Sequence, residues 1–119
     1  MQCNSILIVE DDESIRETFK LALEIKGYTV FTASNGKEGI EALPKMPRPC
    51  LILLDLMMPV MDGWGFIDAL EEDIRLAGIP VVVITAFSEK SKSIKAKKVI
   101  KKPVDLDTLF TVVTQYCDN

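Results

Sequence analysis

The stretch Leu51-Ile-Leu-Leu-Asp55 places a carboxylate directly after four apolar residues. A short apolar run of this kind is typical of a strand that is buried on both faces, as in the parallel sheet of an α/β protein. Other short apolar runs, rich in β-branched residues, alternate along the chain with stretches of helical periodicity. We therefore predict a parallel sheet with strands at 5–9, 29–33, 51–54, 81–84 and 98–101.

The three most apolar runs, 5–9, 51–54 and 81–84, are predicted to lie at the centre of the sheet, and the other two at its edges. The connecting helices are expected to cover both faces, which makes the fold a doubly wound α/β fold. The helix before the last strand is predicted to be shortened or irregular, because residues 88–97 offer only Ile94 and Ala96 for burial.

Length and composition set the domain organisation. With 119 residues, 48% of them hydrophobic, the chain is predicted to form one domain over residues 1–119. It lacks an apolar run of roughly 18 residues and a signal-like start, so we expect a soluble, cytoplasmic protein. Its three widely spaced cysteines, Cys3, Cys50 and Cys117, are expected to be reduced structural thiols.

Charge is distributed unevenly along the chain. The net charge is −4, yet seven of the 14 lysines and arginines lie within residues 90–102. This basic run could face an acidic partner or nucleic acid, but a solvated surface is the interpretation we favour. The sequence contains no histidine, which excludes a Ser-His-Asp catalytic group and any zinc site that needs imidazole.

Polar residues follow the predicted strands where the carboxyl ends of parallel strands meet at one edge of the sheet. They are Glu10, Asp11, Asp55, Thr85 and Lys102. Three carboxylates in one place repel one another, so the arrangement calls for a divalent cation. Magnesium accepts such hard oxygen ligands best, with manganese as an alternative. A cation, a lysine and a hydroxyl are also the groups that neutralise a transferring phosphoryl group.

In this order and spacing, these residues resemble the response-regulator receiver family over essentially the whole chain. The resemblance rests on four motifs, namely Ile8-Val-Glu-Asp11, Asp55-Leu-Met-Met-Pro59 with Met61-Asp-Gly63, Ile84-Thr-Ala86, and Lys101-Lys-Pro103. It implies a flavodoxin-like fold with five strands in the order 2-1-3-4-5.

The resemblance also implies a role for each site residue. Asp55 would be the phosphoacceptor, with Asp11 as a direct metal ligand and Glu10 as a ligand acting through water. The backbone carbonyl of Met57 would complete the protein ligands. Thr85 would be the hydroxyl that moves toward the new phosphoryl group. Lys102 would be the family's cation, in a cis peptide bond with Pro103. Asp12 lies one position beyond the acidic pair and is predicted to start the first helix.

The implied function is that of a signalling switch rather than an enzyme. A histidine kinase or histidine phosphotransfer protein would donate the phosphoryl group to Asp55, because this chain has no histidine of its own. The output would be a changed binding surface for a downstream protein or a fused output domain. A homodimer is left open, and neither a membrane nor nucleic acid is expected as a direct partner.

The chain departs from the family in the region that transmits the switch. The family usually has an aromatic residue where this chain has Val99, and Phe87 is the nearest substitute. The segment from Thr85 to Lys102 is also about five residues shorter than the resemblance implies. A degenerate receiver that acts as a phosphorylation-independent interaction or dimerisation module is therefore the alternative. A haloacid-dehalogenase phosphatase is disfavoured, because it needs a second aspartate where Met57 stands.

Overall fold

The computed structural model describes residues 3–86 and 94–117. In this part of the chain, five parallel strands form one sheet in the order β2-β1-β3-β4-β5. This order confirms the predicted fold class and the predicted central and edge strands. Two strands run one residue further than predicted, so that Asp55 and Thr85 are their last residues. The strands are β1 (Ser5–Val9), β2 (Thr29–Ala33), β3 (Leu51–Asp55), β4 (Val81–Thr85) and β5 (Lys98–Lys101).

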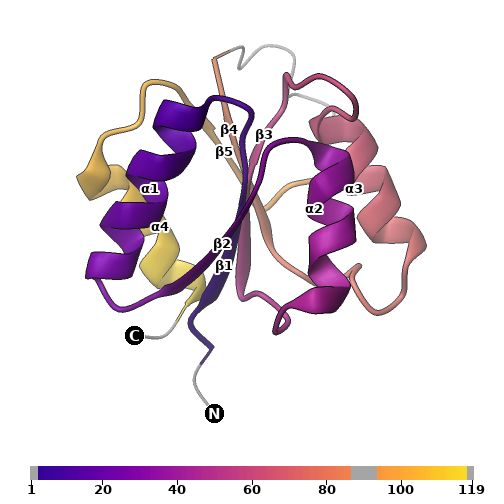
Figure 1. Ribbon diagram of the computed structural model, residues 1–119, viewed down its shortest axis with the longest axis horizontal. Coiled ribbons are helices and arrows are strands. Elements are labelled where there is room, and N and C mark those ends of the chain that lie inside the picture. The colour runs from indigo at the N-terminus through magenta and orange to yellow at the C-terminus, as the bar shows by residue number, and fades with distance from the viewer. Residues whose placement is uncertain (1–2, 87–93, 118–119) are drawn as a thin grey trace.

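Helices cover both faces of the sheet. Figure 1 shows α1 and α4 on one face and α2 and α3 on the other. A short 3-10 helix, Leu43–Lys45, follows α2 and contains Pro44, which lacks the N–H that a continuing α-helix needs. In the described residues the α-helices are α1 (Glu13–Ile25), α2 (Gly36–Ala42), α3 (Gly63–Glu72) and α4 (Leu106–Tyr116).

Local hydrogen bonds explain where these helices begin and end. Each α-helix starts after a residue whose side-chain oxygen accepts a bond from a backbone N–H in the first turn. Gly27 follows α1 with a φ of 98°, a conformation that glycine adopts without strain. The capping residues are Asp12, Asn35, Asp62 and Asp105, of which Asp12 is predicted above to start the first helix.

The hydrophobic core consists of two layers because side chains alternate between the faces of a strand. In β1, Ile6 and Ile8 pack in the layer that contains residues of α1 and α4, whereas Leu7 and Val9 pack in the layer that contains residues of α2 and α3. Because helices cover both faces of the central strands, polar side chains can gather at the ends of these strands.

The connection from β4 to β5 is described only in part. Residues 94–97 are not helical, which agrees with the predicted shortening of a helix at this place. Phe87, the predicted substitute for the missing aromatic residue, lies outside the described residues. Val99 of β5 is 36% exposed and pairs with Val83 of β4. The position where the family usually has an aromatic side chain is thus a partly exposed valine on an edge strand.

The prediction of three reduced thiols is wrong for two of the cysteines. Cys3 and Cys50 form a disulfide with a Cα–Cα distance of 5.8 Å, while Cys117 is free and buried. The reason is the pairing of β1 with β3, since Cys50 N donates to Ser5 O just before the two strands run side by side.

None of the helices in the described residues has the length and apolar character of a membrane span.

Candidate metal site

Strand pairing brings the predicted site residues together at the carboxyl edge of the sheet. Glu10 and Asp11 follow β1, Asp55 ends β3, and Thr85 ends β4. One carboxylate oxygen from each of Glu10, Asp11 and Asp55 lies within 4.8 Å of the others. The expected convergence of three carboxylates is therefore present.

Lys102 supplies a positive charge beside two of these carboxylates. Its Nζ lies 2.7 Å from Glu10 Oε1 and 3.6 Å from Asp55 Oδ2. Glu10 and Asp55 are 3% and 6% exposed, whereas Asp11 is exposed. The site thus has a buried side, where an ion pair is shielded from water, and an open side at Asp11.

The close packing of these charged groups shifts the pKa values of Asp55 and Lys102. Burial, together with the neighbouring carboxylate of Glu10, raises the pKa of Asp55 to about 7, although the charge of Lys102 acts against the shift. Burial also lowers the pKa of Lys102, but bonding and attraction to Glu10 and Asp55 outweigh it, so the pKa lies above its usual value. One lysine does not balance two buried carboxylates, and a bound cation would.

The donor set fits a hard divalent cation. Glu10, Asp11 and Asp55 offer carboxylate oxygens, one of them on the open side of the site. Magnesium binds such oxygens and keeps several of its own waters, which an incomplete protein cage permits. The backbone carbonyl of Met57 as a further ligand stays a prediction.

Backbone hydrogen bonds hold the site residues in place. Glu10 N donates to Ala33 O of β2 at 3.0 Å, and Asp12 N donates to Glu10 Oε2 at 3.1 Å. On the other side, Lys102 N donates to the carbonyl of the buried Thr85 at 2.8 Å. Lys102 is joined to Pro103 by the predicted cis peptide bond.

Two features of the site have no counterpart in the sequence predictions. Arg16 of α1 donates from Nη1 to the carbonyl oxygen of Glu10 at 2.9 Å. The acceptor is a backbone atom, so no sequence motif indicates this bond. Val60, in the loop after β3, has a φ of 71°, a conformation that turn rules assign to glycine or asparagine.

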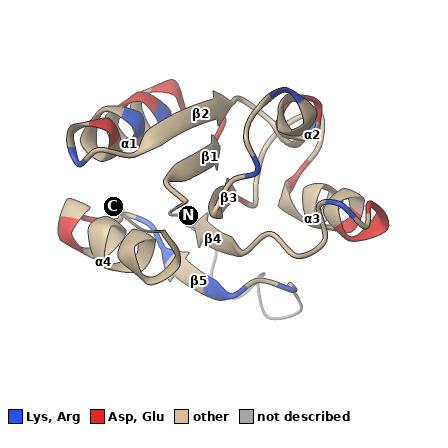
Figure 2. Ribbon diagram, turned by 90° about the horizontal axis from the view of Figure 1, so that it is seen from below, with Lys and Arg blue, Asp and Glu red and all other residues tan. Residues whose placement is uncertain are grey.

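Away from this edge, the surface beside β5 carries the basic run. Figure 2 shows lysines along β5 and the chain that leads into it. Lys97, Lys98 and Lys101 are exposed, and Lys95 pairs with Glu71 of α3 at 3.6 Å. These exposed side chains agree with a solvated surface, and lysines on an edge strand also hinder pairing with other strands.

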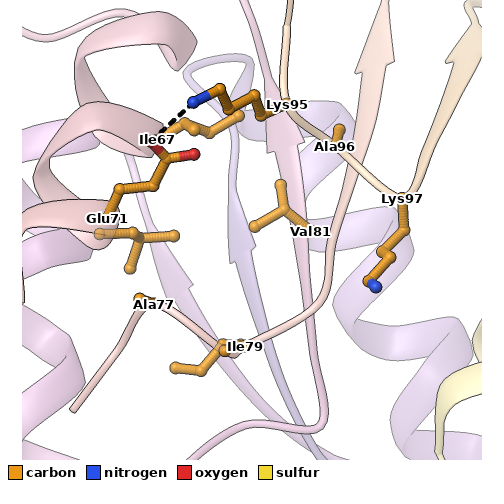
Figure 3. A pocket seen from close by; sticks show the side chains of 10 residues that line it. Ile67, Glu71, Ala77, Ile79, Val81, Lys95, Ala96 and Lys97 are labelled. Carbon is orange, nitrogen blue, oxygen red and sulfur yellow. Dashed lines mark ion pairs between the residues drawn. The ribbon is translucent and has the colours of Figure 1, made fainter. Parts of the chain in front are cut away.

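A hollow lies between α3 and the chain before β5. It has a volume of about 340 Å³ and is lined by apolar residues such as Ile67, Ile79 and Val81 (Figure 3). The Lys95–Glu71 ion pair lies along one side. The hollow is separate from the acidic site, because it shares no residue with it.

Comparisons with known proteins agree with this geometry. The family model described as "Response regulator receiver domain" matches residues 6–114. The polar-differentiation response regulator DivK of Brucella anthropi is 31% identical over 117 residues, covering 94% of each chain. The DNA-binding dual master transcriptional regulator RpaA of Synechocystis is 36% identical over 113 residues. That match covers 91% of this chain but 46% of RpaA, so the chain spans about half the length of that relative.

A solved structure of a response regulator is similar to this chain over nearly its whole length. The response regulator TrrA of Thermotoga maritima, in complex with Mg²⁺-BeF, superposes with a TM-score of 0.83 at 26% identity. The match covers 95% of this chain and 98% of TrrA. The order of the strands, the acidic group at their carboxyl edge and the family match lead to one conclusion, which is that this chain belongs to the response regulator receiver domain family, whose members are signalling switches of two-component systems.

Proposed function

We propose that Asp55 accepts a phosphoryl group from a phosphohistidine on a histidine kinase or histidine phosphotransfer protein. The carboxylate oxygen of Asp55 forms a new P–O bond while the P–N bond of the phosphohistidine breaks, and the donor histidine leaves without the phosphoryl group. The observation that carries the proposal is the position of Asp55, buried at the strand edge beside Glu10, Asp11 and Lys102.

Magnesium supports this reaction by neutralising the oxygens of the transferring phosphoryl group when it is bound. We propose Glu10, Asp11, Asp55 and the carbonyl of Met57 as its ligands. TrrA, whose structure contains Mg²⁺-BeF, lends support by similarity. Lys102 already contacts Asp55 at 3.6 Å, so its charge is in place to stabilise a phosphoryl oxygen.

Asp55 attacks only as a carboxylate, and its pKa of about 7 means that much of it is protonated near neutral pH without metal. A bound cation favours the charged form and lowers this pKa. We therefore expect phosphorylation to depend on the metal both for charge neutralisation and for ionisation of Asp55.

The proposed output is a change of the surface near Thr85 and β5. Phosphorylation adds negative charge and acceptor oxygens at Asp55, and the Thr85 hydroxyl is proposed to move toward them. We further propose that residues 1–119 form a single receiver unit that acts in the cytoplasm on a downstream protein or a fused output domain.

A second candidate function follows from Val99. Its position lacks the aromatic side chain that usually rotates in the family, and it is 36% exposed. A receiver that binds a partner or a second copy without phosphorylation would need no such rotation. The two functions differ in whether Asp55 takes up a phosphoryl group.

Acetyl phosphate with MgCl₂ separates them, with intact-protein mass spectrometry as the measurement. We expect the mass of one phosphoryl group on the wild type and none without Mg²⁺. Asp55→Asn should abolish the addition, whereas Asp68→Asn, an exposed aspartate of α3, should react as the wild type. An unmodified wild type that also fails to bind beryllofluoride would favour the phosphorylation-independent module.

A further inference from the structure

Arg16 holds the short turn that carries the acidic pair. Its Nη1 donates to Glu10 O at 2.9 Å, and its backbone N donates to Asp12 O at 2.9 Å. These two carbonyls flank Asp11 on either side in the chain. One residue of α1 therefore closes both ends of the turn, and the backbone of Asp11 lies between the two bonds.

Glu10 is 3% exposed, and each of its polar atoms has a partner. Its N–H bonds to Ala33 O, and its two carboxylate oxygens bond to Lys102 Nζ and Asp12 N. Arg16 supplies the bond to the remaining polar atom, the carbonyl oxygen. Without it, a buried carbonyl would have to turn toward water, and the carboxylate of the same residue would turn with it.

The guanidinium also lies near a second loop of the same edge. Its charge contributes to lowering the pKa of Glu38, although the main cause is the hydrogen bonding of Glu38 with Ser34. Glu38 Oε1 accepts from Ser34 N at 3.1 Å, directly after β2. Arg16 thus contacts the turn after β1, and its charge acts on Glu38, which bonds to the loop after β2. A guanidinium is suited to this place because its fork of donors is rigid.

We propose that Arg16 is a positioning residue for the metal site, which sets the directions of the Glu10 and Asp11 carboxylates through the backbone of their turn. This proposal rests on the proposed function and deepens it, since it names the residue on which Mg²⁺ affinity depends outside the ligands. Arg16 is not one of the proposed metal ligands, and its hydrogen bonds to the turn end on backbone carbonyl oxygens. Its effect reaches the site through Glu10 and Asp12.

Three variants test the proposal by calorimetric titration with MgCl₂. Arg16→Met removes the donor and the charge, and Arg16→Lys keeps the charge without the rigid fork. Lys20→Met is the matched control, because Lys20 lies one turn further along α1 and takes part in none of these bonds. We expect Arg16→Met to weaken Mg²⁺ binding about 10- to 100-fold, Arg16→Lys to weaken it less, and Lys20→Met to leave it unchanged.

The rate of labelling by acetyl phosphate supplies a second readout. The Arg16 variants should need more Mg²⁺ for half-maximal labelling, yet approach the wild-type rate when Mg²⁺ is saturating. A loss of thermal stability with unchanged Mg²⁺ affinity would show a purely structural role and overturn the proposal. Tighter Mg²⁺ binding by Arg16→Met would also overturn it, because repulsion between Arg16 and the metal would then dominate.

Folding and function can be judged separately in these experiments. If Arg16→Met does not fold, the comparison of Arg16→Lys with the wild type decides the question. A wild type that binds neither Mg²⁺ nor beryllofluoride would refute the proposed function itself, and the inference with it. A wild type that binds both, with Arg16 variants equal to it, would refute the inference alone.

Discussion

The carboxyl ends of the strands form one side of the sheet, its carboxyl edge, and their amino ends form the opposite side, its amino edge. Different interactions hold these two edges together. At the carboxyl edge, Glu10 and Asp55 are buried beside each other with one lysine between them, and the pKa of Asp55 is raised to about 7. At the amino edge, the Cys3–Cys50 disulfide joins the chain just before β1 and β3. The carboxyl edge thus contains two carboxylates that repel each other, and the amino edge contains a covalent cross-link.

The difference between the two edges shows how a small domain can accommodate a charged site. Repulsion at the ends of β1 and β3 tends to separate these two strands, and the disulfide connects the same two strands at their beginnings. Their paired residues between the two ends are buried, from Ile6–Leu51 to Val9–Leu54. The disulfide and the acidic site thus lie at opposite ends of one strand pair, and we expect that each can be changed without loss of the other.

The largest effect is expected from breaking the disulfide. Cys3→Ser, or reduction of the wild type, should lower the free energy of unfolding by about 4 kcal/mol, because a cross-link over 47 residues restricts the unfolded chain. Urea unfolding with and without dithiothreitol measures it, and the variant should no longer respond to the reductant. Beryllofluoride binding should persist in the folded fraction. Equal stability of the oxidised and reduced wild type would contradict the comparison.

The second effect concerns pH in the absence of metal. The native state keeps a proton on Asp55 up to about pH 7, whereas the unfolded chain releases it near the usual value of 3.8. Because the native state binds more protons in this window, the free energy of unfolding should fall as the pH rises from 4 to 7.

The expected fall attributable to Asp55 is about 3 kcal/mol, measured by urea unfolding in EDTA. Asp55→Asn should remove most of this slope and be more stable than the wild type at pH 8. Added Mg²⁺ should flatten the slope in the wild type alone. An equal pH dependence of the free energy of unfolding in the wild type and in Asp55→Asn would mean that groups other than Asp55 cause it.

Two glycines allow the edges to be compared by one matched substitution. A Cβ on Gly63, after β3, would lie 2.7 Å from Leu56 Cδ2 and 2.8 Å from Leu56 Cα, so a backbone atom would have to move. A Cβ on Gly78, before β4, would meet Arg48 Nη2 at 3.2 Å, the end of a flexible side chain.

We therefore expect Gly63→Ala to cost about 2 kcal/mol in urea unfolding and to weaken beryllofluoride binding. Gly78→Ala should change the free energy of unfolding by less than about 0.5 kcal/mol. Similar losses in the two variants would mean that the site edge is no more tightly constrained than the opposite edge.

Much of this architecture could be predicted from the sequence because its signals are local. Apolar runs identify the strands, and Asp12 marks the start of α1 by side-chain capping. The site residues came from the same signals, since polar residues after parallel strands meet at one edge. β3 and β4 each end one residue later than the sequence predicts, because Asp55 and Thr85 still pair within the sheet.

The features that escaped prediction depend on contacts between distant segments or on backbone atoms. The pairing of Cys3 with Cys50 requires the register of β1 on β3, and an odd number of cysteines suggested free thiols. The bond from Arg16 ends on a carbonyl oxygen, which every residue has. Turn rules place glycine rather than Val60 at a positive φ.

The smallest effect is expected at Val60, where the site edge contains backbone strain. Met61 N donates to Pro59 O at 2.8 Å, which closes a three-residue turn around Val60 with its φ of 71°. Such a turn is strained for a β-branched residue, and the Val60 side chain is 77% exposed, so it gains little from burial. Relief of the strain should outweigh the greater freedom of glycine in the unfolded chain.

Val60→Gly should therefore raise the free energy of unfolding by about 1 kcal/mol. Val60→Ala should recover less of the gain, because alanine keeps a Cβ. Urea unfolding gives the stability, and beryllofluoride titration gives the response of the site. A stabilised Val60→Gly variant with weaker beryllofluoride binding would mean that the strained turn helps to hold the site edge ready for its ligand. A destabilised variant would instead mean that the turn contains little strain, and that backbone strain at Val60 is not one of the features that distinguish the two edges.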